Sequence, residues 1–376
     1  MTDDAGDAYD VIIAGGGLAG CSAAIALAQA GRSVLVLEKD RMPRDKLCGE
    51  FLSTEVSELC DQLGVLGRLT AGRSRDIRRL LATSPGGPVF TALLPGPAMG
   101  VSRHTLDAAF VDRAREAGAD VREETAVESI SGSMARGFTV SFDRSSARGR
   151  VVLGAHGRRD LLDRRLHRTF LHDTSPYVAF KAHFVGLDMQ DRIELHSFPG
   201  GYCGLLTEDH GTVNVCWISH QRGLKAAGGS PKTMIETVMR ANPFLADRLD
   251  HLERSGDFLA ASQLFFNRKT LFAGDVCMIG DAAGMIAPLC GDGMAMAIQS
   301  GTLASANAVA FLDGRTDAAG FKAAYSKEWR SRFALRMRLG RLLHAAYVHP
   351  AVSDWGLRAA RLVPSMADLV IRATRG

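Results

Sequence analysis

The feature that most constrains the fold is a glycine-rich turn between a short apolar strand and a helix near the N-terminus. Residues 9–14 (YDVIIA) are apolar and rich in β-branched side chains, which predicts a buried parallel strand. The turn at residues 15–20 (GGGLAG) satisfies G-x-G-x-x-G, and residues 21–30 predict a helix of small side chains. Residues 32–38 (RSVLVLE) predict a second buried strand that ends in an acid. Strand, glycine turn, helix, strand and acid in this order predict a dinucleotide-binding unit, and therefore an α/β protein with a Rossmann-like domain.

Each part of this unit has a role in holding a dinucleotide. Gly15 permits the tight turn, Gly17 lets the backbone approach a pyrophosphate, and Gly20 lets the helix pack closely on the strand. The helix N-terminus offers unpaired N–H groups and positive partial charge to the phosphates. Glu38 can accept both ribose hydroxyls of an adenosine and disfavours a 2′-phosphate, so FAD or NAD is favoured over NADP. Ala19 and Lys39 complete the predicted contacts.

Composition places the chain among soluble globular proteins and excludes several classes. Its 376 residues are about twice or more the usual ~100–200 of one domain, so two packed domains are expected. Hydrophobic residues make up 46% and charged residues 23%, which excludes wholesale disorder and fibrous structure. A chain of this size buries ~75% of its unfolded surface and needs no disulfide or structural metal. The net charge of +4 is too small and too dispersed for a nucleic-acid-binding protein.

The spacing of the cysteines and the N-terminal residues indicate the cellular compartment in which we expect the protein. The seven cysteines (21, 48, 60, 203, 216, 277 and 290) form no CxxC pair, so neither a disulfide framework nor a metal site is predicted. Reduced thiols are typical of a cytoplasmic protein. The acidic N-terminal residues argue against a signal peptide. The apolar run 11–30 is long enough for a membrane span, but three glycines break it, so a strand and a helix are predicted and no integral membrane segment is expected.

The segment after this unit favours FAD over NAD by resemblance. Residues 41–53 are RMPRDKLCGEFLS, and Lys46-x-Cys48-Gly49-x-x-x-Ser53 resembles a segment of the geranylgeranyl reductase family. That family is a branch of the flavoprotein group that also holds the p-hydroxybenzoate-hydroxylase-like monooxygenases. The resemblance implies that Cys48, with Gly49 and Phe51, lies against the flavin ring. Without the resemblance, Cys48 would be interpreted as a small buried hydrophobic residue.

A second segment is similar to the same flavoprotein group. Residues 100–127 predict a strand, a turn, a helix and a strand, with Arg103 just before the helix and Val127 near the end of the second strand. The resemblance implies that Arg103 reaches the cofactor and that the backbone of Val127 holds the adenine ring. A surface ion pair with Asp107 is the alternative for Arg103.

Residues 151–164 (VVLGAHGRRDLLDR) resemble the group's second cofactor motif, in which a strand ends in Ala-Asp-Gly. Here His156 stands at the position of the Asp, and by itself it is interpreted as a turn residue rather than a catalytic base. The departure puts the usual docking of NAD(P)H in doubt. NAD(P)H is therefore retained only as a candidate transient electron donor.

The strongest motif lies at residues 276–301 (VCMIGDAAGMIAPLCGDGMAMAIQSG) and closely resembles the GDAAxxxxPxxGxG element of the flavoprotein group. The resemblance implies that Gly280 permits close approach and that Asp281 binds a hydroxyl of the ribityl chain or the pyrophosphate side. The helix that opens near Gly293 points its N–H groups at the flavin, and its positive end stabilises the reduced anion. Pro288, Gly291 and Met294 complete this set. Two flavin signatures in family order predict FAD as the cofactor.

The remaining sequence predicts a second domain and a helical tail. Residues 74–98 and 177–264 alternate apolar and polar positions between turn signals, which predicts an antiparallel substrate-binding sheet inserted into the FAD-binding domain. Tyr202 is a candidate substrate contact or a packed aromatic residue, and the sequence leaves both open. The tail is expected to cap the cavity rather than lie on a membrane surface. The FAD-binding domain then comprises residues 1–73, 99–176 and 265–335, and the C-terminal helical segment comprises residues 336–376.

The resemblance implies an FAD-dependent oxidoreductase with a small-molecule substrate. The sequence carries no second G-x-G-x-x-G after a strand, which excludes disulfide reductases with two nucleotide domains, and its three tryptophans do not form the WxWxIP segment of flavin-dependent halogenases. We favour a monooxygenase of secondary metabolism that hydroxylates or epoxidises an aromatic or polyketide-like molecule through a flavin hydroperoxide. The alternative is a reductase or dehydrogenase acting on a carbon–carbon double bond, and a minor alternative is a non-catalytic flavin-binding module. Cys48 is the one candidate catalytic residue.

Overall fold

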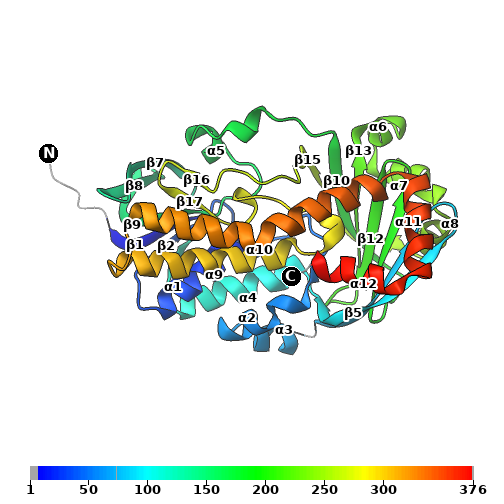
Figure 1. The fold of residues 1–376 in the computed structure, drawn as a ribbon, viewed down its shortest axis with the longest axis horizontal. Helices are drawn as coiled ribbons and strands as arrows, with labels where there is room; N and C mark the ends of the chain where they lie inside the picture. Colours follow the sequence, from blue (N-terminus) through cyan, green and yellow to red (C-terminus); the bar gives the residue numbers. More distant parts are fainter. Residues whose placement is uncertain (1–6, 73, 375–376) are drawn as a thin grey trace.

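The computed structural model describes residues 7–72 and 74–374 and shows an α/β protein built on two β-sheets (Figure 1). Most of the acidic N-terminal stretch considered for a signal peptide lies outside the described residues. The first sheet has the strand order β16-β17-β9-β1-β2-β6, and β8 pairs with β9 and with β7. Its strands are β1 (Ala8–Ala14), β2 (Val34–Leu37), β6 (Asp120–Arg122), β7 (Val127–Ser133), β8 (Gly137–Phe142), β9 (Ser145–Gly154), β16 (Phe272–Ala273) and β17 (Val276–Met278).

The centre of this sheet is the predicted dinucleotide-binding unit. β1 lies between β2 and β9 and is parallel to both, and Val11, Ile12 and Ile13 are fully buried. A strand covered on both faces needs a continuous apolar run, which residues 11–14 supply. The helix that follows, α1 (Leu18–Gln29), packs against α9 (Gly293–Leu312). The contact is so close that a Cβ on Gly301 would lie 2.3 Å from the Ala19 carbonyl oxygen.

Within the described residues, α9 is the one helix that is long and apolar enough to cross a membrane. However, 61% of that stretch is buried inside the protein. Packing against α1 therefore accounts for its apolar composition. The apolar run at residues 11–30, which raised the same question in the sequence, forms β1 and α1 instead.

The second sheet has the order β14-β10-β13-β12-β11-β4-β5-β3, with β15 also paired to β10. Neighbouring strands are antiparallel except for β11 and β4, which are parallel. A buried cluster that includes Phe180, Trp217 and Leu245 joins one face of this sheet to α8. The strands are β3 (Phe51–Leu52), β4 (Arg75–Thr83), β5 (Val89–Gly100), β10 (Tyr177–Val185), β11 (Arg192–Phe198), β12 (Gly201–Thr207), β13 (Val213–His220), β14 (Glu253–Arg254) and β15 (Leu259–Ser262).

Long C-terminal helices connect the two sheets. α10 (Ala318–Tyr347) runs along the molecule, and α11 (Pro350–Leu362) and α12 (Pro364–Ala373) lie beside the second sheet (Figure 1). The other α-helices are α2 (Ser57–Gln62), α3 (Leu66–Ala71), α4 (Arg103–Glu116), α5 (Leu161–Arg165), α6 (Gln221–Ala226), α7 (Pro231–Glu236) and α8 (Pro243–Asp250). Short 3-10 helices are η1 (Thr54–Val56), η2 (Thr169–His172), η3 (Val238–Ala241), η4 (Gly280–Ala282) and η5 (Pro288–Cys290).

The structure corrects some positions in the predicted elements. Val127 opens β7 instead of ending the previous strand, because β6 ends at Arg122 and Glu124 turns the chain with a φ of 54°. Arg103 is the first residue of α4 rather than the residue before it. α10 continues unbroken through the boundary placed between residues 335 and 336. The domain boundaries as a whole stay a prediction.

Candidate functional site

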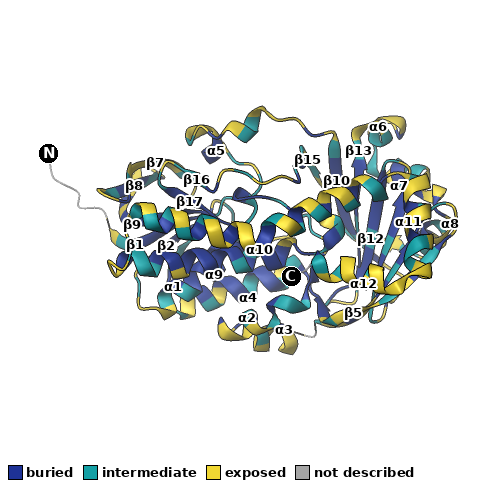
Figure 2. Cartoon of the chain, in the orientation of Figure 1, coloured by how far each residue is buried: buried dark blue, intermediate teal, exposed yellow. Residues whose placement is uncertain are grey.

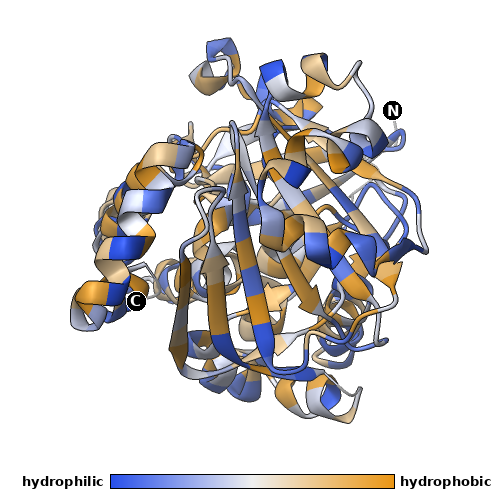
Figure 3. Cartoon of the chain, turned by 90° about the vertical axis from the view of Figure 1, so that its right-hand side faces the viewer, coloured by the Kyte–Doolittle hydropathy of each residue, from blue (hydrophilic) through white to orange (hydrophobic). Residues whose placement is uncertain are grey.

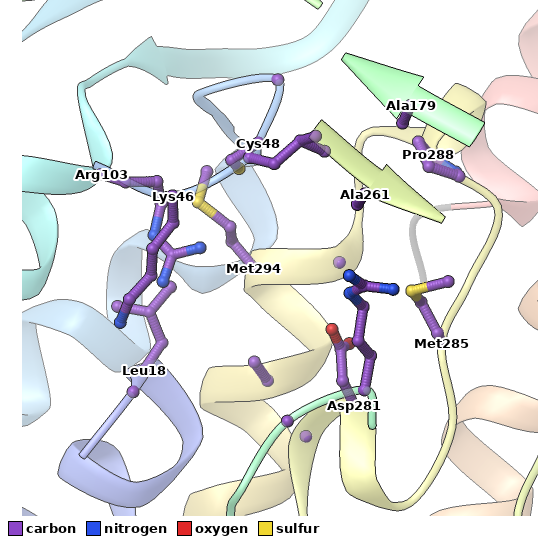
Figure 4. Close-up of a pocket in the computed structure, with 18 of the residues that line it drawn as sticks. Leu18, Lys46, Cys48, Arg103, Ala179, Ala261, Asp281, Met285, Pro288 and Met294 are labelled. Atoms are coloured by element: carbon purple, nitrogen blue, oxygen red, sulfur yellow. The ribbon is translucent and has the colours of Figure 1, made fainter. Parts of the chain in front are cut away.

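A cavity of about 630 Å³ lies between the two sheets. One part of its wall comes from the turn after β1, the end of β2, the segment at residues 44–51 and the GDAA segment. The other part comes from the second sheet. Every residue predicted to contact FAD or substrate lines this cavity, with the exception of Gly20. Figure 4 shows Arg103, Lys46 and Cys48 on one side and Asp281, Met285 and Pro288 on the other.

The glycine turn forms a cradle at the N-terminus of α1. Gly15 has a φ of 115°, and a Cβ there would lie 2.4 Å from the Ala155 carbonyl oxygen. A Cβ on Gly17, in contrast, would meet nothing within 4 Å, so this glycine borders open space. The first turn of α1 carries no acidic side chain and its N-cap makes no side-chain hydrogen bond. This end of the helix therefore fits a pyrophosphate, which its N–H groups would bind.

Glu38 is held in place for the predicted contact with a ribose. It is buried at the end of β2, where its Oε2 accepts a hydrogen bond from the Gly16 N–H at 2.7 Å. Its Oε1 accepts from the Asp40 N–H at 3.1 Å. Each carboxylate oxygen keeps a further lone pair for a ribose hydroxyl.

A positively charged cluster forms the wall between the cradle and Cys48. Arg103 Nη2 donates to both carboxylate oxygens of Asp107 at 2.9 and 3.0 Å, and Lys46 Nζ lies 2.8 Å from Asp107 Oδ2. Burial alone would lower the pKa of Arg103, but the Asp107 carboxylate holds it above its usual value. The buried Arg103 Nε has no hydrogen-bond partner among the described residues. Both interpretations of Arg103 are thus compatible: it pairs with Asp107, and it keeps a spare donor for an anionic group.

The GDAA segment places a half-buried acid, Asp281, on the opposite wall. Gly280 has a φ of 57°, and a Cβ there would lie 2.8 Å from the Ala19 Cβ. Burial raises the pKa of Asp281, whose carboxylate has no hydrogen-bond partner in the part of the chain described. Lys269 Nζ donates to the Asp281 backbone carbonyl at 2.9 Å, and burial lowers the pKa of Lys269 to about 8. A half-buried carboxylate on the cavity wall fits the predicted contact with a cofactor hydroxyl.

A buried ionic cluster fixes the segment that carries Cys48. Glu50 is fully buried with a φ of 57°, and it accepts hydrogen bonds from Lys181 Nζ at 2.5 Å and His183 Nε2 at 3.0 Å. Burial raises the pKa of Glu50, but His183 and Lys181 outweigh this and hold it below its usual value. Asn214 Nδ2 donates to the Cys48 carbonyl at 3.0 Å. These contacts tie the segment to β10 and β13. No local motif in the sequence indicated a role for Glu50, Lys181, His183 or Asn214.

The cavity wall supplied by the second sheet carries no charge. Tyr202 and Cys216 are its ionisable members, and burial raises the pKa of Cys216 to about 12 and that of Tyr202 well above its usual value. The Tyr202 oxygen accepts from the Leu289 N–H at 2.9 Å. Both side chains are therefore neutral near pH 7. The wall comprises Ala179, Ile193, Leu195, Tyr202, Gly204, Leu205, Leu206, Cys216, Trp217, Ile218, Leu259, Ala260, Ala261 and Leu264.

His156 occupies the position where the resembling group has Asp. It follows β9 and lines the cavity, and its Nε2 lies 2.9 Å from Asp163 Oδ1. Its buried Nδ1 has no hydrogen-bond partner within the described residues. The structure therefore places His156 in a loop on the cavity wall, and its interpretation as a turn residue rather than a catalytic base stays a prediction.

A buried histidine lies behind Tyr202. The ring of His344 packs against Tyr177, Tyr202 and Phe266, with centroid distances of 4.5, 5.6 and 4.8 Å. Burial lowers the pKa of His344 from 6.5 to about 4. The folded protein thus keeps this imidazole neutral between these two values, where the unfolded chain protonates it.

This difference predicts a loss of stability in acid that depends on His344. As the pH falls from 6.5 to 4, proton uptake by the unfolded chain should remove about 3 kcal/mol of the free energy of unfolding. His344→Phe fills the same aromatic site with a side chain that binds no proton, so this variant should not show the acid-dependent loss that His344 causes. Urea unfolding of both proteins across this pH range measures the effect. If the free energies of unfolding of the two proteins changed with pH by the same amount, the prediction would be contradicted.

Comparison with known proteins shows the family to which the chain belongs. Residues 8–338 match the FAD binding domain family, and the chain belongs to this family. It is 24% identical to digeranylgeranylglycerophospholipid reductase 2 from Methanopyrus kandleri over 98% of this chain and 93% of that protein. It is 28% identical to menaquinone reductase from Mycobacterium tuberculosis over 95% of this chain and 89% of that protein. The structure of the flavin-dependent brominase Bmp2 superposes with a TM-score of 0.83 at 20% identity, covering 98% of this chain and 93% of that one.

These findings confirm the predicted fold class and the resemblance to the reductase and hydroxylase-like flavoproteins. The protein is an FAD-dependent oxidoreductase. The similarity to the brominase shows the fold alone. The roles assigned to individual cavity residues stay predictions.

Proposed function

We propose that the protein is a reductase that saturates a carbon–carbon double bond in an apolar, isoprenoid-like molecule. The observation that carries this proposal is the uncharged wall of the second sheet, which continues into the cofactor cradle as one cavity. A cavity wall without charge favours a substrate without charge. Both curated relatives named above are reductases, one of a digeranylgeranyl lipid and one of menaquinone, and each aligns over most of its length.

The residues of the cradle divide the work of holding FAD. The N–H groups of α1 and the cluster of Arg103 and Lys46 would bind the pyrophosphate, Glu38 the ribose, and Asp281 a ribityl hydroxyl. When bound in its reduced form, FAD supplies a hydride to one carbon of the double bond, and a proton completes the other. The apolar wall excludes water and orients the substrate.

The buried cluster at Glu50 supports a route for that proton. Glu50 lines the cavity, and its Oε2 accepts from His183 Nε2 at 3.0 Å. The His183 side chain is 22% exposed, whereas the Glu50 side chain is fully buried. A proton taken up from solvent at the His183 imidazole can therefore pass to a Glu50 oxygen on the cavity wall.

A monooxygenase that hydroxylates or epoxidises its substrate, which the sequence favours, is the second candidate. The apolar wall supports it as well, because oxygen transfer requires that water be kept from the reacting atoms. Its products would belong to secondary metabolism. The seven free cysteines support a cytoplasmic location for either enzyme.

One experiment separates the two candidates. The FAD-loaded protein is reduced without air and mixed with a geranylgeranyl lipid or a prenylated quinone. A reductase reoxidises its flavin at once, and the product gains two hydrogen atoms. A monooxygenase reoxidises only when oxygen is admitted, and the product gains an oxygen atom. If the flavin reoxidised slowly, no substrate accelerated this reaction and no product formed, the result would favour the non-catalytic flavin-binding module.

Cys48→Ala tests the predicted position of the thiol beside the flavin ring. Cys48 and Arg103 both line the cavity. We expect unchanged FAD content and a change of about tenfold in the rate of anaerobic flavin reoxidation by substrate. Cys203→Ala, at a buried cysteine of the second sheet that does not line the cavity, is the matched control. Loss of FAD from the Cys48 variant would instead assign the thiol a structural role.

A further inference from the structure

Exposed apolar side chains are concentrated on the C-terminal helices. Among the described residues, thirteen large hydrophobic side chains are exposed, and nine of them lie between residues 335 and 370. Trp355 is 78% exposed and Leu362 is 83% exposed. The nine are Leu335, Leu342, Val352, Trp355, Leu362, Val363, Met366, Leu369 and Val370. Figure 2 shows the outer surfaces of α11 and α12 as mostly exposed.

The spacing of these residues makes each helix amphipathic. On α11, Val352, Trp355 and Leu362 follow one another at intervals of about one or two turns and share an outer face. On α12, Met366, Leu369 and Val370 do the same. The opposite faces are packed, since Leu357 is buried and Ala367 and Ile371 are partly buried against the second sheet. Figure 3 shows the mixture of hydrophobic and hydrophilic residues along these helices. An apolar outer face on a helix already packed on its inner face marks a contact surface.

The charge of the same region is positive. Residues 335–374 contain six arginines and two aspartates. Asp354 accepts hydrogen bonds from Ser84 Oγ and from the Gly86 N–H, and Asp368 lies 3.7 Å from Arg372. Arg338, Arg358 and Arg361 are exposed and have no carboxylate partner in the described part of the chain. The region therefore offers both apolar side chains and unneutralised cations.

The inner faces of these helices lie over the apolar end of the cavity. Ile193, Leu195 and Leu206 line the cavity. The same three side chains share a hydrophobic cluster with Ile371 of α12, and Leu195 also contacts the cluster that holds Leu357 of α11. One layer of side chains thus separates the apolar end of the cavity from the inner face of α12.

We infer that α11 and α12, with the end of α10, form a docking face for an anionic lipid bilayer, from which an apolar substrate enters the cavity. The docking itself follows from the exposed side chains and their charge, and the delivery of substrate rests on the proposed function. Apolar side chains insert into the interface between head groups and acyl chains, and arginines bind anionic head groups. A second copy of the chain fits this face less well, because a symmetric dimer would bring the unneutralised arginines of both copies together.

Vesicle binding tests the docking face without any substrate. The FAD-loaded protein is sedimented with vesicles of phosphatidylcholine alone or mixed with phosphatidylglycerol. We expect binding to the mixed vesicles and a blue shift of tryptophan emission. Trp355 alone can report this shift, because Trp217 and Trp329 are each 1% exposed. Arg358→Gln with Arg361→Gln should weaken binding about tenfold or more.

Matched double variants separate this face from a general effect of charge. Leu362→Asp with Leu369→Asp should abolish binding, whereas Leu161→Asp with Val185→Asp, at exposed positions outside the C-terminal helices, should leave it intact. Equal loss of vesicle binding in both double variants would overturn the proposal. The same holds if the unaltered protein, folded and loaded with FAD, stays in the supernatant. A dimer in gel filtration that only the first variant dissociates would assign the face to a second copy. Vesicle binding by a protein that reduces no substrate would instead contradict the proposed function alone.

Discussion

Gly17→Val is expected to leave the protein folded but to weaken its binding of FAD, whereas Gly20→Val is expected to prevent folding. The two glycines belong to one motif and lie three residues apart, yet their surroundings differ. A Cβ on Gly17 would meet nothing within 4 Å. Gly17 also has φ −74° and ψ −175°, an extended backbone that valine adopts readily. Its side chain would occupy the space where we predict that the pyrophosphate approaches.

At Gly20 an added Cβ would lie only 1.9 Å from the Gly15 carbonyl oxygen. The clash is with backbone in the tight turn, so no side chain can move aside to relieve it. The free-energy cost of this clash should amount to a large part of the free energy of unfolding, which is ~5–15 kcal/mol for a typical domain. The clash exists without any cofactor, so added FAD should not rescue this variant.

Circular dichroism and FAD titration of the purified variants measure both effects. We expect a native spectrum for Gly17→Val and at least about a tenfold weaker affinity for FAD. Gly20→Val should yield no folded protein. If Gly17→Val bound FAD like the unaltered chain, the pyrophosphate would not lie at this turn. If Gly20→Val folded and bound FAD, the packing assigned to this glycine would be wrong.

The part of the cavity predicted to hold the cofactor could be located from the sequence because its residues lie in short local motifs. A strand, a turn and a helix N-terminus place Gly15, Gly17 and Glu38 by local geometry alone, and the GDAA segment does the same for Asp281. These stretches then meet at one cavity because parallel strands end at the same edge of the first sheet. The sequence misplaced Arg103 and Val127 relative to the ends of their helix and strand. Errors of this size are usual, because the ends of helices and strands are the least certain part of any assignment.

The residues around the part of the cavity predicted to hold the substrate could not be identified as fully from the sequence, because their contacts depend on the register between distant strands. Lys181 reads as one polar position in an alternating strand, yet it is buried against Glu50, 131 residues away in the sequence. His344 lies on a basic helix and nothing local indicates its aromatic surroundings. The C-terminal segment was expected to cap the cavity. α12 does pack over its apolar end through Ile371, but its outer residues stay exposed, which the sequence did not indicate.

The contact between Lys181 and Glu50 leads to the second large prediction. Lys181→Met should lower the free energy of unfolding by about 3–5 kcal/mol at pH 7, because it leaves a buried carboxylate without its cation. Methionine matches the length of the lysine stem, so the loss reports the charge rather than a cavity. Lys232→Met is the matched control, because the Lys232 side chain is 75% exposed and, among the described residues, forms an ion pair only with Glu236 at 3.8 Å. An exposed pair of this kind is worth about 0–1 kcal/mol.

The pH dependence of the Lys181 variant identifies Glu50 as the group responsible. In the unaltered protein the pKa of Glu50 is held below 4.5, so its contribution is complete above that pH and is lost as the pH falls through the lowered value. In the variant, burial is opposed by His183 and the Arg103 N–H alone, so the pKa of Glu50 rises above its value in the unaltered protein. Part of the destabilisation is therefore relieved as the pH falls through this higher value. The difference between the two proteins should therefore shrink between pH 7 and 4.5. A constant difference would place the loss in packing and remove Glu50 from the charge balance of the site.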